Sequence, residues 1–417
     1  MKEKLRLPRL WGEKLILIVI FFVFTLFFTN DFGLIDIQKT AIILAAGVDK
    51  SETGNFNVTV QIAVPQASKS GGATTAVALS GEGETVAQAF KEINAKTGWF
   101  PKLIFCDLIV LGEDTVKEDV FNCLGYFLRN EYMSDNCLLA TCEGKAEELL
   151  NAQIPTENMT SFALQKVLAT EAKQAGNIST VNLKDFSAGY YAEHKSGYMP
   201  YVRAVPQKEG QQSTGQGGSP GQAFAPFHDS TPVQSQSSSS SQKSGGGEEQ
   251  KVFDASQTAV FYEGKKVGLL TQEQSFAMNL AVNSIRVATL EVPIADKTYA
   301  LSLSNVSSNI KFKVEESTPR LHVSLKATVR ESDCSSSRPL TEIAEINKVL
   351  PEILQEAEKI LTDELYSVFE TCRAENCDIF EVLDKLQKFE NEYYDAYKEV
   401  VLDRVVPDFK VTLKDAA

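Results

Sequence analysis

The stretch "DIQKTAIILAAGVDKSETGNFNVTVQIAVP", residues 36–65, decides what kind of fold opens the body of this chain. Its first half, "TAIILAAGVDK", is a short continuous apolar run. Its second half alternates, with apolar side chains at Phe56, Val58, Val60, Ile62 and Val64. The intervening "SETGN" carries the Gly and Asn that a tight turn favours. The stretch therefore predicts a β-hairpin.

The same stretch raises the question of nucleotide binding, because an apolar strand runs into Gly47. A dinucleotide site requires G-x-G-x-x-G between a strand and a helix, so that backbone N–H groups and the helix N-terminus meet the pyrophosphate. Gly47 stands alone, and a second strand follows it. Gly81 and Gly83 do precede a predicted helix, but the glutamates beside them would repel phosphate. We interpret that segment as a helix-entry loop.

The charge balance excludes one class of function. The chain has 417 residues and a formal net charge of −14. Its first fourteen residues carry five basic and two acidic side chains, which leaves the remainder at −17. An acidic body repels phosphate backbones, so we expect no nucleic-acid partner. The length is sufficient for two or three hydrophobic cores.

The amino terminus predicts a membrane anchor. Residues 15–28, "LILIVIFFVFTLFF", are nearly all apolar and follow a basic cluster. This polarity places a basic tail, residues 1–14, in the cytoplasm and the rest of the chain outside. The run is about 21 Å long as a helix, short of a ~30 Å hydrocarbon core, and continuation to residue 35 would supply part of the difference. We predict a single transmembrane helix at 15–35.

A cleaved signal peptide is the alternative interpretation of this terminus. Its cleavage end should carry small residues in an A-x-A-like pattern. The sequence there is "FFTND", which does not fit. The first cysteine of the chain is Cys106, so no lipobox precedes the body. We therefore favour an uncleaved anchor.

Strands and helices alternate through residues 37–150. The helix "TVAQAFKEINAKTG" has Thr85 as a candidate N-cap and ends at Gly98. The strand "KLIFCDLIVLGED", the helix "TVKEDVFNCLGYFLRNEY", the strand "NCLLATCEG" and the helix "KAEELLNAQ" follow. Residues 155–203 are weakly patterned, with a helix-like section at 162–172 and a strand-like "TVNLKDF". We predict an N-terminal α/β region at 36–205, with a possible subdomain break near 150.

Residues 206–250 are rich in Gly, Ser, Gln and Pro, which predicts a disordered linker. The next segment, 251–417, opens with a hairpin that turns at Glu263-Gly264 and continues with further strands. Apolar residues then recur at helical spacing over 343–369, with Pro351 either kinking the helix or occupying its first turn. A second helix is expected from 378 to about 401, and "VPDFKVTLKD" closes the chain as a strand. We predict an α+β domain, with this long amphipathic helix packed on a mostly antiparallel sheet.

Motifs of catalysis are missing from the sequence. It has no G-x-x-x-x-G-K-[ST], no H-E-x-x-H and no G-x-S-x-G. The three histidines, His194, His228 and His322, suggest no Ser-His-Asp or Cys-His pairing. The spacing of the cysteines fits neither a zinc knuckle nor a redox motif, so we interpret them as ordinary thiols: Cys106, Cys123, Cys137, Cys142, Cys334, Cys372 and Cys377. We predict no catalytic, cofactor-binding or metal-binding residue, and no cofactor.

The order of the motifs resembles the C subunit of spore germinant receptors, the Ger(x)C family. The matching pieces are spread over nearly the whole body: "DIQKTAIILAAGVDKSETGNFNVTVQIAVP", "SGEGETVAQAFKEI", "PKLIFCDLIVLGEDTVKEDVFNCLGYFLRNEY", "TVNLKDF", "YMPYVRAV", "AVFYEGKKVGLLT", "DIFEVLDKLQKF" and "PDFKVTLK". Each piece alone is a soft pattern, and their shared order carries the resemblance.

The resemblance implies a non-enzymatic subunit attached to the outer face of the spore inner membrane. It would act with a larger A subunit and a multi-spanning, transporter-like B subunit, and the complex would detect nutrients such as amino acids or sugars. The family's soluble part is built from mixed α/β domains, commonly described as three. No ligand or catalytic residues are carried over, because the family supplies none that match this sequence.

Three departures from the family pattern stand out. Family members usually carry a lipobox cysteine, and here an uncleaved helix would replace the lipid. The 206–250 segment is longer than the usual connection. The section "EVLDKLQKFENEYYDAY" lacks the glycines and the proline-tryptophan pair that the family leads us to expect, which indicates a divergent member.

Two other classes of protein remain as alternatives to a receptor subunit. One is a membrane-tethered, extracytoplasmic solute- or envelope-binding module with another sporulation role. The other is an extracytoplasmic hydrolase, which would need a pair of catalytic carboxylates. The acidic residues mostly follow the spacing of solvated helix faces, which does not favour the hydrolase.

Overall fold

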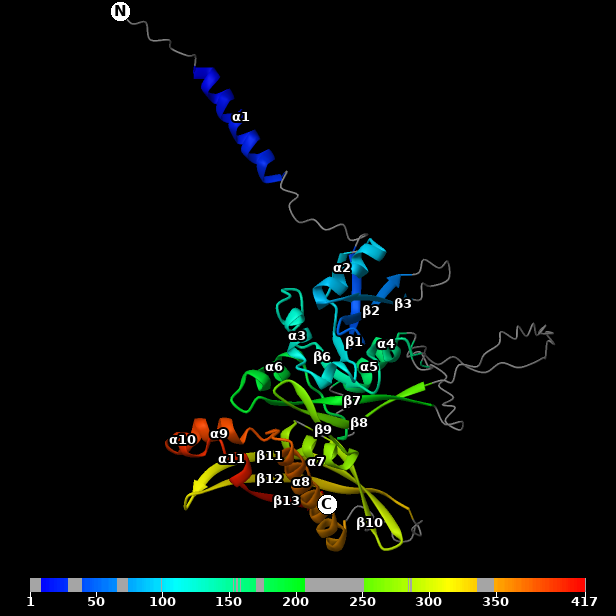
Figure 1. Ribbon diagram of the computed structural model, residues 1–417, viewed down its shortest axis with the longest axis vertical. Coiled ribbons are helices and arrows are strands. Elements are labelled where there is room, and N and C mark those ends of the chain that lie inside the picture. The colour runs from blue at the N-terminus through cyan, green and yellow to red at the C-terminus, as the bar shows by residue number, and fades with distance from the viewer. Residues whose placement is uncertain are drawn as a thin grey trace, which may run out of the picture.

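Two β-sheets with helices packed against them form the body of the protein, as the computed structural model shows (Figure 1). Within the described residues, the first sheet has nine strands and the second has four. The arrangement is α+β, as the sequence predicts. The structure describes residues 9–28, 40–65, 74–98, 100–152, 154, 157, 159–169, 176–206, 251–283, 285, 287–335 and 349–416.

Parallel strands form the centre of the first sheet. The four of them lie side by side in the order β1 (Thr40–Lys50), β5 (Leu108–Leu111), β6 (Leu138–Cys142) and β7 (Ser196–Pro206). The short β4 (Phe100–Lys102) also pairs in parallel with the start of β1. An antiparallel pair extends each side, namely β2 (Phe56–Pro65) with β3 (Thr74–Gly83) and β8 (Lys251–Tyr262) with β9 (Lys265–Leu270).

Helices cover both faces of this sheet. One apolar core includes residues of α2 (Val86–Thr97), α3 (Phe121–Leu128) and α6 (Leu183–Tyr191), and a second includes residues of α4 (Ala146–Leu150) and α5 (Thr160–Leu168). Alternate residues of a strand point to opposite faces. In β5, Ile109 and Leu111 therefore enter the first core, whereas Leu108 and Val110 enter the second. Burial on both faces explains why β5 is a continuous apolar run.

The predicted hairpin at 36–65 is confirmed for its described part, where β1 and β2 pair antiparallel. Gly47 and Asp49 of β1 both contact the start of α4. A Cβ on Gly47 would lie 3.0 Å from the Cβ of Ala146, so the strand and the helix approach closely there. The carboxylate of Asp49 accepts hydrogen bonds from the N–H groups of Ala146 (2.7 Å) and Glu147 (2.9 Å). These two positions therefore hold a helix N-terminus in place.

The predicted ends of α2 are also confirmed. The Thr85 hydroxyl accepts a hydrogen bond from the N–H group of Gln88 at 3.2 Å. Gly98 adopts the left-handed conformation with φ 68° and donates its N–H to the carbonyl of Asn94 at 2.7 Å. Both features are standard helix signals that the sequence displays directly.

Three elements of the first half differ from the prediction. The single strand predicted for "KLIFCDLIVLGED" is divided into β4 and β5 by a turn at 103–107. The helix predicted from Thr115 is a 3₁₀ turn (Thr115–Lys117) followed by α3. "TVNLKDF" leads into α6 rather than forming a strand, because the Asn182 side chain caps the helix by accepting the N–H of Asp185 at 2.7 Å.

The second sheet follows the order β10 (Val287–Ile294), β11 (Lys297–Glu315), β12 (Thr318–Cys334) and β13 (Val406–Asp415). The first three strands are antiparallel, and β13 runs parallel to β12. The long helix α8 (Pro351–Ala374) packs on this sheet, as predicted, and shares one apolar core with it. Pro351 occupies the first turn of α8 instead of kinking it. The predicted beginning of the helix, 343–348, lies outside the described residues.

Two helical segments of the second half differ from the prediction. The helix α7 (Gln272–Val282) was not predicted from the sequence, although Thr271 and Gln274 form a capping box at its start. The single helix predicted from 378 to 401 is wrong, because Glu390 leaves the helical conformation with φ −131° and ψ 44°. The chain forms α9 (Val382–Phe389), a 3₁₀ turn (Asn391–Tyr393), α10 (Tyr394–Tyr397) and α11 (Val401–Arg404).

The first sheet crosses the predicted domain boundary at 251. β8 and β9 fall within the predicted C-terminal domain, yet β8 pairs with β7 and the predicted Glu263-Gly264 turn joins β8 to β9. The linker predicted for 206–250 lies outside the described residues, except for Pro206 at the end of β7. The domain limits themselves stay a prediction.

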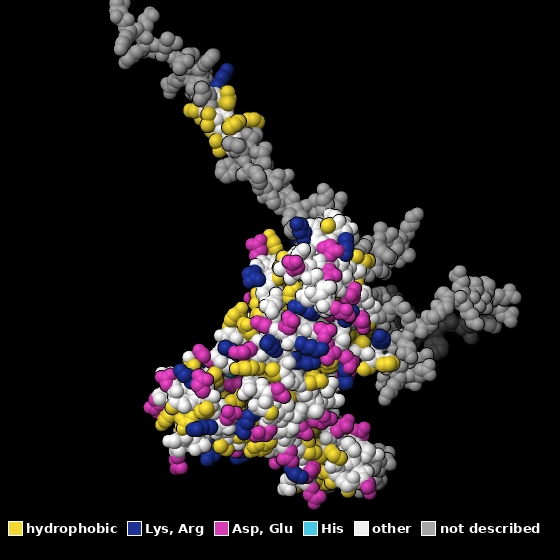
Figure 2. All heavy atoms as spheres, viewed as in Figure 1, with side chains coloured by type: hydrophobic (Ala, Val, Ile, Leu, Met, Phe, Trp, Pro, Cys, Tyr) yellow, Lys and Arg dark blue, Asp and Glu magenta, His cyan; other side chains and the backbone are white. Residues whose placement is uncertain are grey.

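The helix α1 (Arg9–Phe28) covers part of the predicted anchor. Its described side chains are exposed and, apart from Lys14, hydrophobic from Ile16 to Phe24 (Figure 2). In the part of the chain that the structure describes, no helix has the length and hydropathy required to cross a membrane. Residues 29–35 of the predicted anchor lie outside that part. The anchor therefore stays a prediction.

Candidate functional site at the junction of the two sheets

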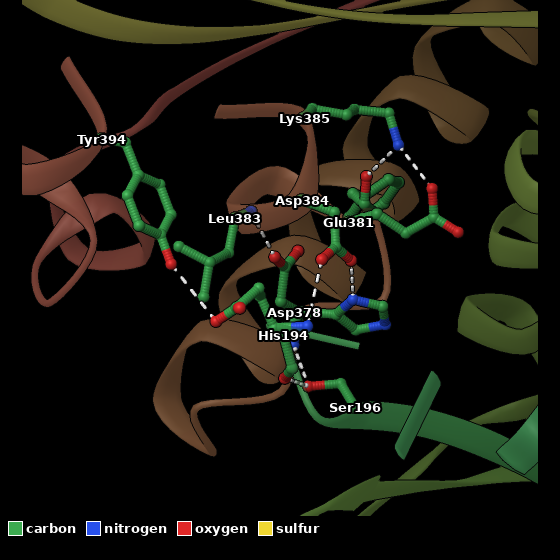
Figure 3. A network of polar contacts seen from close by, with 10 residues as sticks. His194, Ser196, Asp378, Glu381, Leu383, Asp384, Lys385 and Tyr394 are labelled. Carbon is green, nitrogen blue, oxygen red and sulfur yellow. Dashed lines mark hydrogen bonds and ion pairs between the residues drawn. The ribbon is translucent and has the colours of Figure 1, made fainter. Parts of the chain in front are cut away.

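A network of polar side chains joins the first sheet to the C-terminal helices (Figure 3). The first sheet contributes the loop at 192–195, between α6 and β7, and Ser196 at the start of β7. The C-terminal part contributes residues 377–385, which comprise most of the connection between α8 and α9 and the first turn of α9. The two segments are about 190 residues apart in the sequence. Only the packing of the second sheet against the first brings them together.

Asp378 and Ser196 form the buried centre of this network. The Ser196 hydroxyl accepts the backbone N–H of Asp378 at 2.9 Å and donates to the backbone carbonyl of His194 at 2.7 Å. Oδ2 of Asp378 accepts the N–H of Leu383 in the first turn of α9 at 2.9 Å. Burial raises the pKa of the Asp378 carboxyl, and its backbone hydrogen bonds offset part of that rise. Asp378 thus links β7 to α9.

His194 and Asp384 form a second link across the junction. Nδ1 of His194 contacts Oδ2 of Asp384, and the backbone N–H of Glu193 donates to Oδ1 of Asp384 at 3.1 Å. The His194 side chain is only 8% exposed. The Tyr394 hydroxyl donates to the carboxylate of Glu193 at 3.2 Å. The loop at 192–195 is therefore held by both α9 and α10.

Lys385 orders the turn that leads into α9. Its Nζ donates to Oε2 of Glu381 at 2.7 Å and to the carbonyl of Phe380 at 2.8 Å. Burial alone would raise the pKa of the Glu381 carboxyl, but the hydrogen bond and charge of Lys385 outweigh it and lower the pKa. Glu381 adopts a left-handed conformation with φ 56°, which is uncommon for a residue with a side chain. The Lys385 contacts stabilise this turn.

A cavity of about 610 Å³ opens beside the network, between α6, β7, the end of α7 and residues 379–384. Three carboxylates line it, and each already has a partner in the protein. Asp185 accepts from Asn182, while Glu381 and Asp384 are held by Lys385 and His194 as described. The cavity is polar, but its acidic groups are engaged in structural contacts.

The geometry at this junction does not form the triad of a hydrolase. A triad needs the serine hydroxyl to donate to the histidine ring. The Ser196 hydroxyl instead donates to the backbone carbonyl of His194. Among the described residues, no three His, Cys, Asp or Glu side chains are grouped so that they could hold a metal ion. The arrangement is suited to joining two parts of a chain.

No site residue was predicted from the sequence, and the contacts of the histidines were not expected from it either. His194 lies at the junction, and His322 on β12 pairs with Asp408 of β13 at 2.8 Å. His228 lies outside the described residues. The partners of His194 and His322 are 190 and 86 residues away in the chain, so no local pattern could reveal them.

Comparison with known families divides the chain near the limits of the predicted linker. Residues 34–204 match the family described as "Spore germination protein N-terminal domain". Residues 256–414 match "Spore germination B3/ GerAC like, C-terminal". A search of curated proteins found no match.

A solved structure supports the fold. The chain is similar to the one described as "Crystal Structure of the GerBC protein", with a TM-score of 0.51 and 13% sequence identity. The similarity covers 92% of this chain and 100% of the other. At this identity the likeness shows the fold alone. The two family matches, in order and together spanning most of the sequence, show that the chain belongs to the GerAC-like, or Ger(x)C, family of spore germination proteins.

Proposed function

We propose that this protein is a non-enzymatic, membrane-anchored subunit of a spore germinant receptor, and that it takes part in nutrient-triggered germination. It acts with an A subunit and a multi-spanning B subunit at the spore inner membrane. Its N-terminus is cytoplasmic, and its body lies outside the membrane. The observation that carries the proposal is the pair of family matches at 34–204 and 256–414.

The junction supports a structural role for this chain within such a complex. Hydrogen bonds tie Ser196, at the start of β7, to Asp378, and His194 to Asp384 of α9. The segments that match the two family models therefore meet in a shared, buried set of contacts. A body joined in this way can bind two partners at once and keep their spacing fixed.

Deletion of the gene tests the proposed function. We expect spores without the protein to germinate slowly or not at all with nutrients, while growth and sporulation are unchanged. Complementation with the intact gene should restore germination. Normal germination of the deletion strain with every nutrient tested would contradict the proposal. Membrane fractionation without lipid labelling tests the anchor separately.

A second candidate function is a membrane-tethered solute- or envelope-binding module. The polar cavity of about 610 Å³ favours it, because cavities of this size hold small ligands. In this case the purified chain should show a saturable rise in melting temperature with a small polar solute. An Asn283→Leu variant would replace a polar side chain that lines the cavity with a larger, apolar one, and it should abolish the rise in melting temperature. A normal germination phenotype together with solute binding would favour this candidate over the receptor subunit.

A further inference from the structure

Three exposed apolar side chains lie close to where the body begins. Ile104, Phe105 and Tyr132 are 51%, 54% and 45% exposed. Ile104 and Phe105 belong to the turn between β4 and β5, and Tyr132 to the loop between α3 and β6. Leu103 and Tyr132 line the same recess of about 510 Å³, which shows that the turn and the loop are neighbours. We call Ile104, Phe105 and Tyr132 the apolar tip.

The topology places the apolar tip at one particular edge of the first sheet. β1, β4, β5 and β6 run parallel, so their first residues lie at the same edge. Thr40 of β1 pairs with Phe100 of β4, only four residues before Ile104. At ~3.3 Å per residue along a strand and ~4.8 Å between paired strands, the Cα atom of Ile104 lies within about 18 Å of that of Thr40. In Figure 1 this is the upper end of the body, where β1 begins beside α2.

The length of chain before β1 limits how far this edge can lie from α1. Eleven residues, 29–39, connect the end of α1 at Phe28 to Thr40. Fully extended, they reach at most about 40 Å. If α1 lies in a bilayer, this connection limits how far the first residue of β1 can lie from the membrane surface. The edge of the first sheet that carries the tip is therefore held near that surface.

From these observations we infer that the apolar tip contacts the lipid surface of the membrane in which α1 is anchored. The inference rests on the proposed membrane attachment and adds a second, peripheral contact to it. Transfer of Phe and Ile side chains from water to the interfacial region of a bilayer lowers the free energy, and Tyr is enriched in that region. Two points of attachment would fix the orientation of the body above the membrane.

The charges around the tip are balanced, so the contact is apolar rather than electrostatic. Lys102 lies over the ring of Tyr132 at 5.8 Å, and Lys91 and Arg129 line the same recess as Tyr132. The carboxylates of Asp107, Glu131 and Asp135 lie in the same turn and loop. We therefore expect similar contact with neutral and anionic lipids, with little effect of salt.

A lipid-quenching experiment on the full chain tests this inference. The chain is reconstituted into vesicles that contain nitroxide-labelled lipid, and one introduced cysteine carries an NBD fluorophore. Phe105→Cys reports on the tip, and Ile104→Cys is the second probe if the first variant does not fold. Phe389→Cys is the matched control, because Phe389 is 62% exposed and its helix, α9, lies well below the upper end of the body in Figure 1. The unmodified chain gives the background from its own thiols, which are buried apart from the half-buried Cys334.

The expected result is a loss of emission and a blue shift for the probe at 105, and neither change at 389. A probe at Phe21→Cys in α1 separates the two proposals. Quenching at 21 without quenching at 105 or 104 would overturn the lipid contact and leave the anchor standing. An unquenched probe at 21 would instead refute the proposed anchoring. A probe at 105 that lipid does not quench, but that added membrane extract shields from iodide, would identify a protein partner and overturn the lipid contact.

Discussion

Replacement of Asp49 by Ala should destabilise the first sheet strongly. Asp49 is only 4% exposed, and its two carboxylate oxygens accept the N–H groups of Ala146 and Glu147 at the start of α4. The substitution leaves both donors without this acceptor inside the core. A hydrogen bond to a charged group contributes about 1.5–3 kcal/mol, so the loss of both predicts a fall of about 3–6 kcal/mol in the free energy of unfolding. Asp49→Asn keeps one acceptor oxygen and should cost about half as much.

Urea unfolding followed by circular dichroism measures this effect, and hydrogen exchange at the amides of 146 and 147 localises it. Asp114→Ala is the matched control, because the Asp114 side chain is 67% exposed and pairs with the nearby Lys117. We expect the control to change the free energy of unfolding by less than about 0.5 kcal/mol. If Asp49→Ala unfolds at the same urea concentration as Asp114→Ala, the capping role assigned to Asp49 is wrong.

The pH dependence of stability provides an independent check on Asp49. Burial raises the pKa of its carboxyl above the ordinary value of 3.8, although the two backbone N–H groups oppose this. Between 3.8 and the raised pKa, the folded protein holds a proton that the unfolded chain has lost. The unfolded chain binds fewer protons, so this contribution to stability decreases as the pH rises through that window. The stability difference between the native chain and Asp49→Asn should show this decrease.

Three further substitutions probe other parts of the structure. Leu365→Ala, in the buried face of α8, should lower the free energy of unfolding by about 2–5 kcal/mol in urea titrations, and an effect below 1 kcal/mol would argue against the packing of α8 on the second sheet. Thr271→Ala removes the capping box of α7 and should cost about 1 kcal/mol by the same assay, with no cost expected if α7 does not form. Asp384→Ala releases the loop at His194 and should speed proteolysis between α6 and β7, and unchanged cleavage there would contradict the junction.

Several elements could be predicted because their signals are local. Thr85 and Gly98 mark the ends of α2 by capping alone, and the alternating residues of β2 mark a strand with two different faces. The apolar spacing of α8 defines its buried face in the same way. By contrast, "TVNLKDF" has the alternation of a strand, but the cap at Asn182 starts a helix there. Where two local signals compete, the better hydrogen-bond pattern in the folded chain prevails.

The candidate site could not be predicted, because each of its contacts joins distant parts of the chain. His194 and Ser196 are ordinary loop and strand residues by local pattern, and Asp378 is an ordinary acidic residue after a helix. Their roles arise only when β7 and α9 meet. The same holds for Gly47 and Asp49, whose partners in α4 are almost one hundred residues away.

The sequence by itself determined most of the strands and helices, the apolar faces that they bury and the acidic character of the body. These properties depend on residue types at short spacing, which secondary structure converts directly into faces and ends. Only the tertiary structure decided that β8 and β9 complete the first sheet and that α9 closes against β7. The physical reason is that strand pairing and buried polar contacts across long loops depend on how whole surfaces fit, and one strand's pattern is compatible with many neighbours. The stretch at 36–65 contains an example of each case. Its hairpin follows from local sequence, whereas the capping role of Asp49 depends on a helix almost one hundred residues away.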